Sequence, residues 1–274
     1  MTQPEESAVH GGGASHGEDA AQRREDIAEG LRRVSARIEA AVAATPGATT
    51  PQLIAVTKTH PAADVVELAR LGVAHVGENR DQEARPKAAE VERRCIEAGL
   101  TPPAWHFIGQ LQTNKAKYVV RYARTVHGVD RADLVDALER AQGLRLDRGE
   151  ATDDATVLGC LVQVDLDPRP LEQRPPGIGA RGGVAPEHAL ELAAAIDQAP
   201  HLALRGLMCV APRGREPEEA FARLAQLSHQ VQARWPQASW RSMGMSGDLE
   251  AAVRQGATHL RIGSDLLGRA APVG

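Results

Sequence analysis

The sequence has few of the residues that mark secreted, membrane-spanning or stacking proteins. No apolar run approaches the ~18 residues that cross a bilayer, and the acidic N-terminal residues lack the apolar core of a secretory signal. The three cysteines, Cys95, Cys160 and Cys209, are widely spaced and form no C-x-x-C pair, so reduced thiols in a cytoplasmic protein are expected. Aromatic residues make up 3%, which leaves little material for base stacking or aromatic cages.

The charge balance also argues against nucleic acid as a partner. The chain has 32 basic and 36 acidic residues and a formal net charge of −4, whereas dedicated nucleic-acid binding needs a basic excess or stripe. The 274 residues are 42% hydrophobic and 25% charged, which is ordinary for a core-forming protein of one large or two small domains. This composition excludes membrane, collagenous and disulfide-scaffold proteins but does not identify a function.

The N-terminal segment differs in composition from the rest of the chain. Residues 1–20 are rich in Gly, Ser, Glu and Ala and have almost no apolar side chains, so a disordered tail is expected there. From about Ala21, apolar residues recur every three or four positions, which predicts an amphipathic helix that ends before Pro46. The apolar positions of this helix are Ile27, Leu31, Val34, Ile38 and Val42.

The remaining chain alternates short apolar runs with helical patterns. Eight strands, each followed by a helix, over roughly 220 residues match a single (β/α)₈ barrel. We therefore expect an α/β fold in which residues 21–274 form one TIM barrel with an extra N-terminal helix. A doubly wound open sheet is the alternative, but no G-x-G-x-x-G follows the first strand. The strands are expected to begin near Leu53, Val73, Ala104, Thr125, Thr156, Leu202, Ser239 and Thr258.

Lys58 follows the first of these strands. A lysine at the mouth of a buried strand lies in a drier setting than a surface lysine, which favours the neutral, nucleophilic amine. Such an amine can form a Schiff base with a carbonyl compound. The alternative is a rim lysine that extends into solvent, and position alone favours that alternative.

Polar side chains also occur at the ends of the second and third strands, next to glycines. Asn79 follows Gly77 and Glu78, and His106 lies three residues before Gly109. Either side chain could orient the ring of a ligand. For His106, taken alone, a hydrogen-bonded histidine at the rim is the commoner case.

Two loops of small residues follow the last two strands, at residues 242–248 and 261–265. Loops of this kind expose backbone N–H groups at the start of a helix and bind phosphate, and barrels often place phosphate sites after strands seven and eight. Ordinary helix caps are the alternative for either loop alone. A strand-one lysine and a phosphate cradle together describe a covalently held phosphorylated aldehyde, and pyridoxal 5′-phosphate fits that description.

The same residues carry a resemblance to a known family. Over about residues 25–270 the chain resembles the pyridoxal phosphate homeostasis proteins, the YggS-like family, in six motifs that occur in the same order. The motifs are Ile54-Ala55-Val56-Thr57-Lys58-Thr59-His60-Pro61, Gly77-Glu78-Asn79, Trp105-His106-Phe107-Ile108-Gly109, Arg205-Gly206-Leu207-Met208, Ser242-Met243-Gly244-Met245-Ser246 and Arg261-Ile262-Gly263.

The resemblance implies a fold-type III barrel like the N-terminal domain of alanine racemase, with pyridoxal phosphate bound to Lys58. It places Arg261 at the pyridine nitrogen, where a cation keeps that nitrogen unprotonated and weakens the ring as an electron sink. It places Asn79 beside the ring and makes His106 a further contact. The groups that it implies for the phosphate are Ser242, Gly263, Ser264 and the backbone of Met245 and Ser246.

Three positions depart from the family's pattern. Arg80 stands where a tyrosine commonly follows Gly-Glu-Asn, Gly247 stands where an acidic residue is usual, and Arg181 stands where a lysine often precedes a glycine. Arg80 puts a ring contact on that side in doubt. Gly247 alters the entrance of the next helix, and arginine at 181 keeps the charge but cannot form a Schiff base.

The sequence favours cofactor storage and delivery over turnover of an amino acid. A racemase needs a second base opposite Lys58, and Tyr118 and Tyr122, spaced i, i+4, are expected to be a packing pair. Eleven residues follow Gly263 in this sequence, so a β domain that could supply a base is not expected there. We therefore expect a monomer without metal that passes cofactor to apo-enzymes. The alternatives are a slow racemase or lyase with Cys209 or His106 as second proton carrier, and a Schiff-base aldolase acting on a sugar phosphate.

Overall fold

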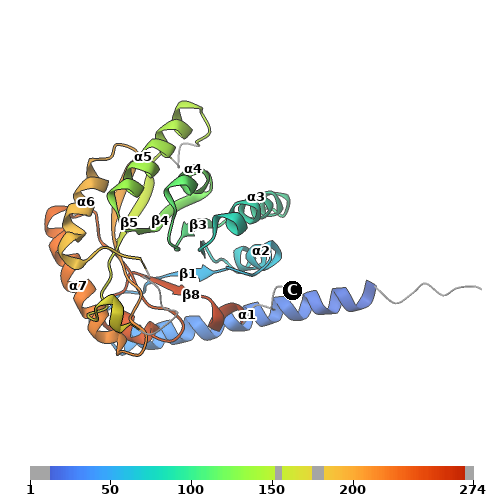
Figure 1. Ribbon diagram of the computed structural model, residues 1–274. Helices are drawn as coiled ribbons and strands as arrows, with labels where there is room; N and C mark the ends of the chain where they lie inside the picture. Colours follow the sequence, from blue (N-terminus) through green and yellow to red (C-terminus); the bar gives the residue numbers. More distant parts are fainter. Residues whose placement is uncertain (1–12, 152–155, 175–181, 269–274) are drawn as a thin grey trace, which may run out of the picture.

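The fold was obtained as a computed structural model, which describes residues 13–151, 156–174 and 182–268. Eight parallel strands close into a barrel in sequence order (Figure 1), so the predicted (β/α)₈ fold is confirmed. The open-sheet alternative is wrong because the first strand pairs with the last, with Leu53 opposite Leu260. The strands are β1 (Gln52–Val56), β2 (His75–Glu78), β3 (Ala104–Phe107), β4 (Ala123–Val129), β5 (Leu158–Gln163), β6 (Leu202–Met208), β7 (Trp240–Ser242) and β8 (His259–Ile262).

Helices cover the outside of the barrel. The α-helices are α1 (Gly13–Ala43), α2 (Ala62–Arg70), α3 (Asp81–Glu97), α4 (Ala116–Val119), α5 (Ala132–Asp147), α6 (Ala189–Gln198), α7 (Pro217–Arg234), α8 (Leu249–Arg254) and α9 (Ser264–Leu267). The 3₁₀ turns are η1 (Thr113–Lys115), η3 (Leu171–Gln173) and η4 (Pro186–His188). In the described part of the chain, no helix combines the length and the apolarity that a membrane crossing requires.

Helix α1 begins at Gly13, so the prediction of a disordered tail is wrong for residues 13–20; residues 1–12 lie outside the described residues. Residues 18–20 are exposed. The helix therefore extends there by propagation from its packed part, where each added residue gains a backbone hydrogen bond without burying a side chain. Further along, Ile27, Val34 and Ile38 are buried as the helical spacing predicts.

The packed part of α1 lies against α8, α9 and α2, beside β8 in Figure 1. The contact with α9 is close: a Cβ added at Gly30 would lie 2.1 Å from the carbonyl oxygen of Leu266. A glycine at this position therefore lets α1 approach the backbone of α9 closely. The extra N-terminal helix is thus packed next to the loops that follow β7 and β8.

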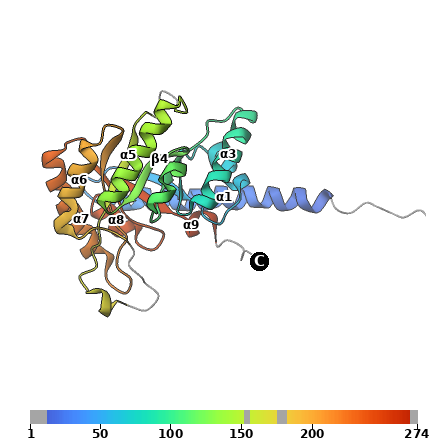
Figure 2. The same cartoon turned by 45° about the horizontal axis from the view of Figure 1, so that its top comes forward.

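The long segment after β5 is anchored at both of its described ends. Val164 pairs with Val184 in a parallel bridge, and Arg174 forms an ion pair with Asp165 at 2.8 Å. Figure 2 shows the yellow part of this segment, around η3, projecting from the body of the barrel. Residues 175–181, which include the predicted departure at Arg181, lie outside the described residues.

The two faces of the barrel strands differ in chemistry. Outward-facing residues such as Val76, Phe107, Val126 and Leu260 pack under the helices in the hydrophobic core. Successive residues of a strand point to opposite faces, so the alternate positions point into the barrel. Several of these inward positions are polar and buried, and they must therefore satisfy one another's hydrogen bonds. They are His106, His127, Ser242, His259 and Arg261.

Candidate functional site

The carboxyl ends of β8, β1 and β2 bring three predicted site residues side by side. Strand β1 pairs with β8 and β2 in registers that place Ala55 opposite Ile262 and Val56 opposite Gly77. Continued by one or two residues, these registers set Asn79 opposite Lys58 and Gly263 opposite Val56 at the mouth of the barrel. In agreement, a Cβ added at Gly263 would lie 3.3 Å from the Cβ of Val56.

Lys58 is an exposed lysine at this mouth. Its Nζ has no hydrogen bond or ion pair within the described residues, and the drier setting expected from the sequence is wrong because the side chain is exposed. The sequence contains three other lysines, and all are placed elsewhere. Lys87 is buried in ion pairs, while Lys115 and Lys117 lie over the ring of Tyr118. Lys58 is therefore the lysine free to react at the mouth.

The residue before Lys58 is held by a buried ion pair. Lys87 Nζ donates to Glu78 Oε1 at 2.7 Å and to the carbonyl oxygen of Thr57 at 2.9 Å. The hydroxyl of Thr57 donates to the same carboxylate oxygen, also at 2.7 Å. Burial raises the pKa of Glu78, and the bonds from Lys87 and Thr57 oppose that rise without cancelling it. The chain immediately before Lys58 is thus fixed from below by two charged side chains.

The residue after Lys58 has an uncommon backbone conformation. Thr59 has φ +67°, in the left-handed region that costs a β-branched residue about 1–3 kcal/mol. Its N–H donates to Glu83 Oε1, and Lys87 Nζ also donates to that oxygen, at 2.8 Å. Although burial alone would raise the pKa of Glu83, these bonds lower it. One lysine and two carboxylates therefore hold both sides of the turn that presents Lys58.

Asn79 offers a hydrogen-bond acceptor that the described protein leaves unused. Its Oδ1 is buried and has no partner. Its position is tightly defined, because a Cβ at Gly109 would lie 2.4 Å from the Asn79 carbonyl oxygen. Arg80, the first departure from the family's pattern, is exposed and precedes α3. A ligand donor beside Asn79 would satisfy this buried oxygen.

The loops after β7 and β8 meet at the same end of the barrel. Ser264 Oγ donates to Ser246 Oγ at 3.2 Å, and the Met245 N–H donates to Asp248 Oδ1. Among the described residues, no acceptor is found for the backbone N–H groups of Ser246, Gly263 and Ser264. A Cβ added at Gly247 would meet nothing within 4 Å, so this departure leaves the cradle open.

Helix α1 clamps both loops through Arg37. Its guanidinium donates to the Ser246 carbonyl oxygen at 3.1 Å and to Glu250 at 2.9 Å, and it forms an ion pair with Asp265. Arg33 adds a bond of 2.7 Å to the Asp265 carbonyl oxygen. Sequence reasoning missed both arginines, because surface arginines on an amphipathic helix give no sign of partners more than two hundred residues away.

Ser242 and Arg261 lie just beneath the mouth, and both are buried. Arg261 donates from Nη1 to Ser242 Oγ and from Nη2 to the Cys209 carbonyl oxygen, both at 2.8 Å. Burial lowers the pKa of Arg261. The Ser242 hydroxyl is thus engaged with Arg261 inside the barrel, and its phosphate role stays a prediction that would require it to change partners.

His106 lies deeper than the sequence suggested. Its Nε2 is 2.9 Å from His75 Nδ1, and its Nδ1 is 2.9 Å from His127 Nε2. Burial, followed by the nearby His75 and His259, lowers the pKa of His106 to about 3. Both ring nitrogens therefore have partners inside the barrel and the side chain has 1% exposure, as for the hydrogen-bonded alternative, and a cofactor contact of His106 stays a prediction.

The groups considered as second proton carriers are not available at the mouth. The Cys209 thiol is buried, and burial raises its pKa to about 12. Tyr118 lies under Arg85, and Tyr122 packs edge-on against Trp105.

Comparison with known proteins identifies relatives of the chain. Residues 30–271 match the family described as alanine racemase, N-terminal domain. The pyridoxal phosphate homeostasis protein of Corynebacterium glutamicum is 40% identical over 217 residues, which cover 79% of this chain and 89% of that protein. PipY of Synechococcus elongatus, solved with PLP bound, has 31% identity and a TM-score of 0.68 over 88% of this chain and 100% of its own. Alanine racemase from C. glutamicum shares the fold at 13% identity and a TM-score of 0.58, over 91% of this chain and 60% of that chain.

Proposed function

The chain belongs to the pyridoxal phosphate homeostasis proteins, and from that membership we propose that it binds pyridoxal phosphate through a reversible Schiff base on Lys58 and buffers or delivers this cofactor. PLP is the bound molecule in the PipY structure, and we extend that binding to this chain. The observation that carries the proposal is a lysine without a partner among the described residues, which the strand registers place opposite Asn79 at one end of a closed barrel.

The groups at the mouth fit the parts of this molecule. When bound, it supplies an aldehyde that condenses with the Lys58 amine and releases one water. The buried Oδ1 of Asn79 needs a hydrogen-bond donor from the ligand side. The hydroxyls of Ser246 and Ser264 and the free backbone N–H groups beside them are donors suited to a phosphate. Arg261, buried and fixed by two hydrogen bonds, would hold a positive charge toward the ring nitrogen.

The arrangement supports storage and delivery over turnover. Proton transfer on the second face of the ring needs a group that can gain and lose a proton near neutral pH. The Cys209 thiol is buried with a pKa near 12, and both His106 nitrogens are hydrogen-bonded within the barrel. An exposed Lys58, by contrast, leaves its bound aldehyde accessible to water and to the amine of a recipient protein.

Borohydride trapping tests the proposal. The full chain is mixed with pyridoxal phosphate, its visible absorption is recorded, and the reduced protein is mapped by peptide mass. We expect a visible band and a mass gain on the Lys58 peptide, with none on the peptide that contains Lys115 and Lys117. A chain that stays colourless and unmodified contradicts cofactor binding.

Matched variants separate the lysine's role from folding. Lys58→Ala is expected to lose the band and the mass gain while keeping the circular dichroism spectrum, whereas Lys117→Ala keeps all three. Amino-acid turnover is then compared with that of free pyridoxal phosphate. Racemisation or elimination well above that background would favour the enzyme alternative, and transfer of cofactor to an added apo-enzyme supports delivery.

A further inference from the structure

A chain of hydrogen-bonded histidines runs through the interior of the barrel. His75, His106 and His127, here called the histidine chain, are linked Nδ1 to Nε2 at 2.9 Å in both steps. His127 Nδ1 lies 2.9 Å from Ser242 Oγ, which accepts from Arg261. One unbroken series of polar contacts therefore joins β2, β3, β4, β7 and β8, and it ends at the guanidinium beneath the mouth.

The chemistry of Arg261 gives this series a direction. A guanidinium only donates, so Ser242 Oγ accepts from it, and the remaining partner of the Ser242 hydroxyl proton is His127 Nδ1. His127 then carries its proton on Nε2 and donates it to His106 Nδ1. By the same rule His106 donates from Nε2 to His75 Nδ1. All three rings are neutral Nε2–H tautomers, and the Nε2–H of His75 takes no part in the series.

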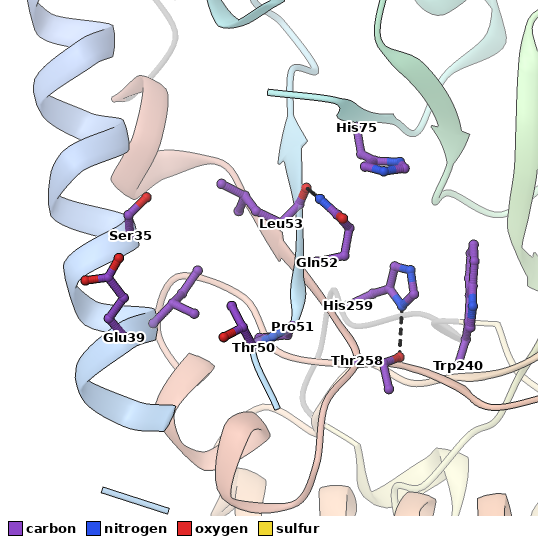
Figure 3. Close-up of a pocket in the computed structure, with 11 residues that line it drawn as sticks. Ser35, Glu39, Thr50, Pro51, Gln52, Leu53, His75, Trp240, Thr258 and His259 are labelled. Carbon is purple, nitrogen blue, oxygen red and sulfur yellow. Dashed lines mark hydrogen bonds between the residues drawn. The ribbon is translucent and has the colours of Figure 1, made fainter. Parts of the chain in front are cut away.

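The far end of the histidine chain opens into a cavity. A cavity of about 630 Å³ lies between α1 and the amino ends of β1, β2, β7 and β8, opposite the mouth, and we call it the basal cavity. His75, Trp240 and His259 line it from the barrel side, and Glu39 lines it from α1 (Figure 3). His75 is half-buried, whereas His106 and His127 have at most 1% exposure. Solvent protons therefore reach the histidine chain at His75.

We propose that the histidine chain positions Arg261 and Ser242 for the cofactor and makes that position depend on protonation of His75 in the basal cavity; this rests on the proposed function. His106 and His127 are positioning residues, since they act through Ser242. The titratable groups around His75 are His106 on β3, His259 on β8 and, across the cavity, Glu39 on α1. Arg205, on β6, lies over the Trp240 ring.

Uptake of one proton by His75 changes the hydrogen bond at the other end of the series, where His127 meets Ser242. Net uptake of one proton from the basal cavity leaves His75 protonated on both ring nitrogens, which turns Nδ1 from an acceptor into a donor. The hydrogen bonds survive only if His106 and His127 exchange their donor and acceptor nitrogens. His127 then donates to Ser242 Oγ, so the serine proton must find another acceptor near the mouth. Burial, which lowers the pKa of both His75 and His106, keeps the rings neutral at neutral pH.

Two substitutions of one residue test the positioning role. In His127→Asn the amide oxygen takes the place of Nδ1 and can accept from Ser242, while the contact with His106 is lost. In His127→Gln the amide takes the place of Nε2, so the contact with Ser242 is lost instead. We expect His127→Gln to weaken pyridoxal phosphate binding about tenfold at pH 8 and to shift the cofactor's absorption maximum. His127→Asn, which keeps the acceptor for Ser242, should lose clearly less affinity at pH 8 than His127→Gln.

The pH profile tests the coupling. From pH 8 to pH 6 the affinity of the unmodified chain should fall more than that of His75→Gln or His127→Asn, which cannot transmit the proton. His259→Gln, altered in the same cavity but outside the histidine chain, should keep the unmodified profile. Equal pH profiles in all four proteins, or equal affinities in both His127 variants, would overturn the proposal.

Histidine nitrogen-15 shifts of the cofactor-free chain keep this test separate from the proposed function. At pH 8, Nε2–H tautomers of His75, His106 and His127 support the deduced direction, whatever the chain binds. An Nδ1–H tautomer at His127 overturns it. Failure of the unmodified chain to bind pyridoxal phosphate at any pH refutes the proposed function and, with it, the claim on cofactor positioning.

Discussion

The ammonium of Lys87 lies 2.7 Å from Glu78 Oε1, and both side chains are buried. This ion pair joins β2 to α3, and Lys87 Nζ also donates a hydrogen bond to the carbonyl oxygen of Thr57. A charged pair in such a place contributes little net stability compared with apolar residues, but it defines where polar atoms must lie. Here the atoms that it fixes belong to the turn that presents Lys58.

Removing one charge of this ion pair should lower the free energy of unfolding. Lys87→Met leaves Glu78 buried without its cation, and we expect the free energy of unfolding to fall by about 3–5 kcal/mol in urea titrations. The double variant Lys87→Met/Glu78→Gln removes both charges and should recover much of the loss. Equal destabilisation of the single and double variants would contradict a buried ion pair. Retention of pyridoxal phosphate should fall in the single variant, because Thr57 loses a donor.

The clamp from α1 should matter more than an equally charged neighbour on the same helix. Arg37→Ala frees Ser246 and Asp265, and we expect about five- to tenfold weaker binding of pyridoxal phosphate. Arg32→Ala is the matched control, because the partners of Arg32 within the described chain are Glu25 and Glu29 of its own helix. Titrations that show the same loss in both variants would refute the clamp.

Gly30 should not tolerate a methyl group, although alanine is the better helix former by ~1 kcal/mol. A Cβ would stand 2.1 Å from the Leu266 carbonyl oxygen, so α1 and α9 must move apart. We expect Gly30→Ala to lower the free energy of unfolding by about 1–3 kcal/mol. Gly247→Ala, whose Cβ meets nothing, should leave stability nearly unchanged. A more stable Gly30→Ala would show that the two helices are not in contact.

Stability should fall in mildly acidic solution. Burial lowers the pKa of His259 to about 4 and that of His106 to about 3, both from 6.5, so below pH 6.5 the unfolded chain binds protons that the folded chain does not. Each such histidine removes about 1.4 kcal/mol per pH unit as the pH falls from 6.5 towards its folded pKa. The raised pKa of Glu78 acts in the opposite direction.

A histidine variant isolates this effect from the carboxylates. Urea unfolding at pH 7, 6 and 5 should show a slope about 1 kcal/mol per pH unit shallower in His259→Gln than in the unmodified chain. His188→Gln, which alters an exposed histidine, should keep the original slope. Parallel slopes in all three proteins would mean that His259 titrates normally when folded.

The barrel could be predicted because its signals are local. Apolar runs and turn residues alternate along the chain, and the observed strands begin within three residues of the predicted positions, as at Gln52 and Ala104. The small-residue loops at 242–248 and 261–265 meet as expected because parallel strands bring their carboxyl ends to one edge. Helix α3 was less visible, since Pro86 interrupts its pattern.

The support of the site could not be predicted, because it depends on contacts between distant residues. Nothing near Arg37 indicates Glu250 or Asp265, and nothing near His106 indicates that its ring lies between two other histidines. The inward or outward direction of a strand residue also depends on the register of its neighbours. Sequence spacing therefore predicted which loops lie at the mouth, but not that His106 is buried between two other histidines.

The contact between α1 and the last two helices has a consequence for the order in which the protein is made. Arg37 and Glu250 are 213 residues apart, and Arg33 reaches a carbonyl 232 residues further along. A ribosome adds about 5–20 residues per second, so α1 waits some tens of seconds for its partners to emerge. The loops after β7 and β8, which we propose hold the phosphate, are therefore among the last parts to form, and a nascent chain that has not yet made α9 lacks this part of the proposed cofactor site.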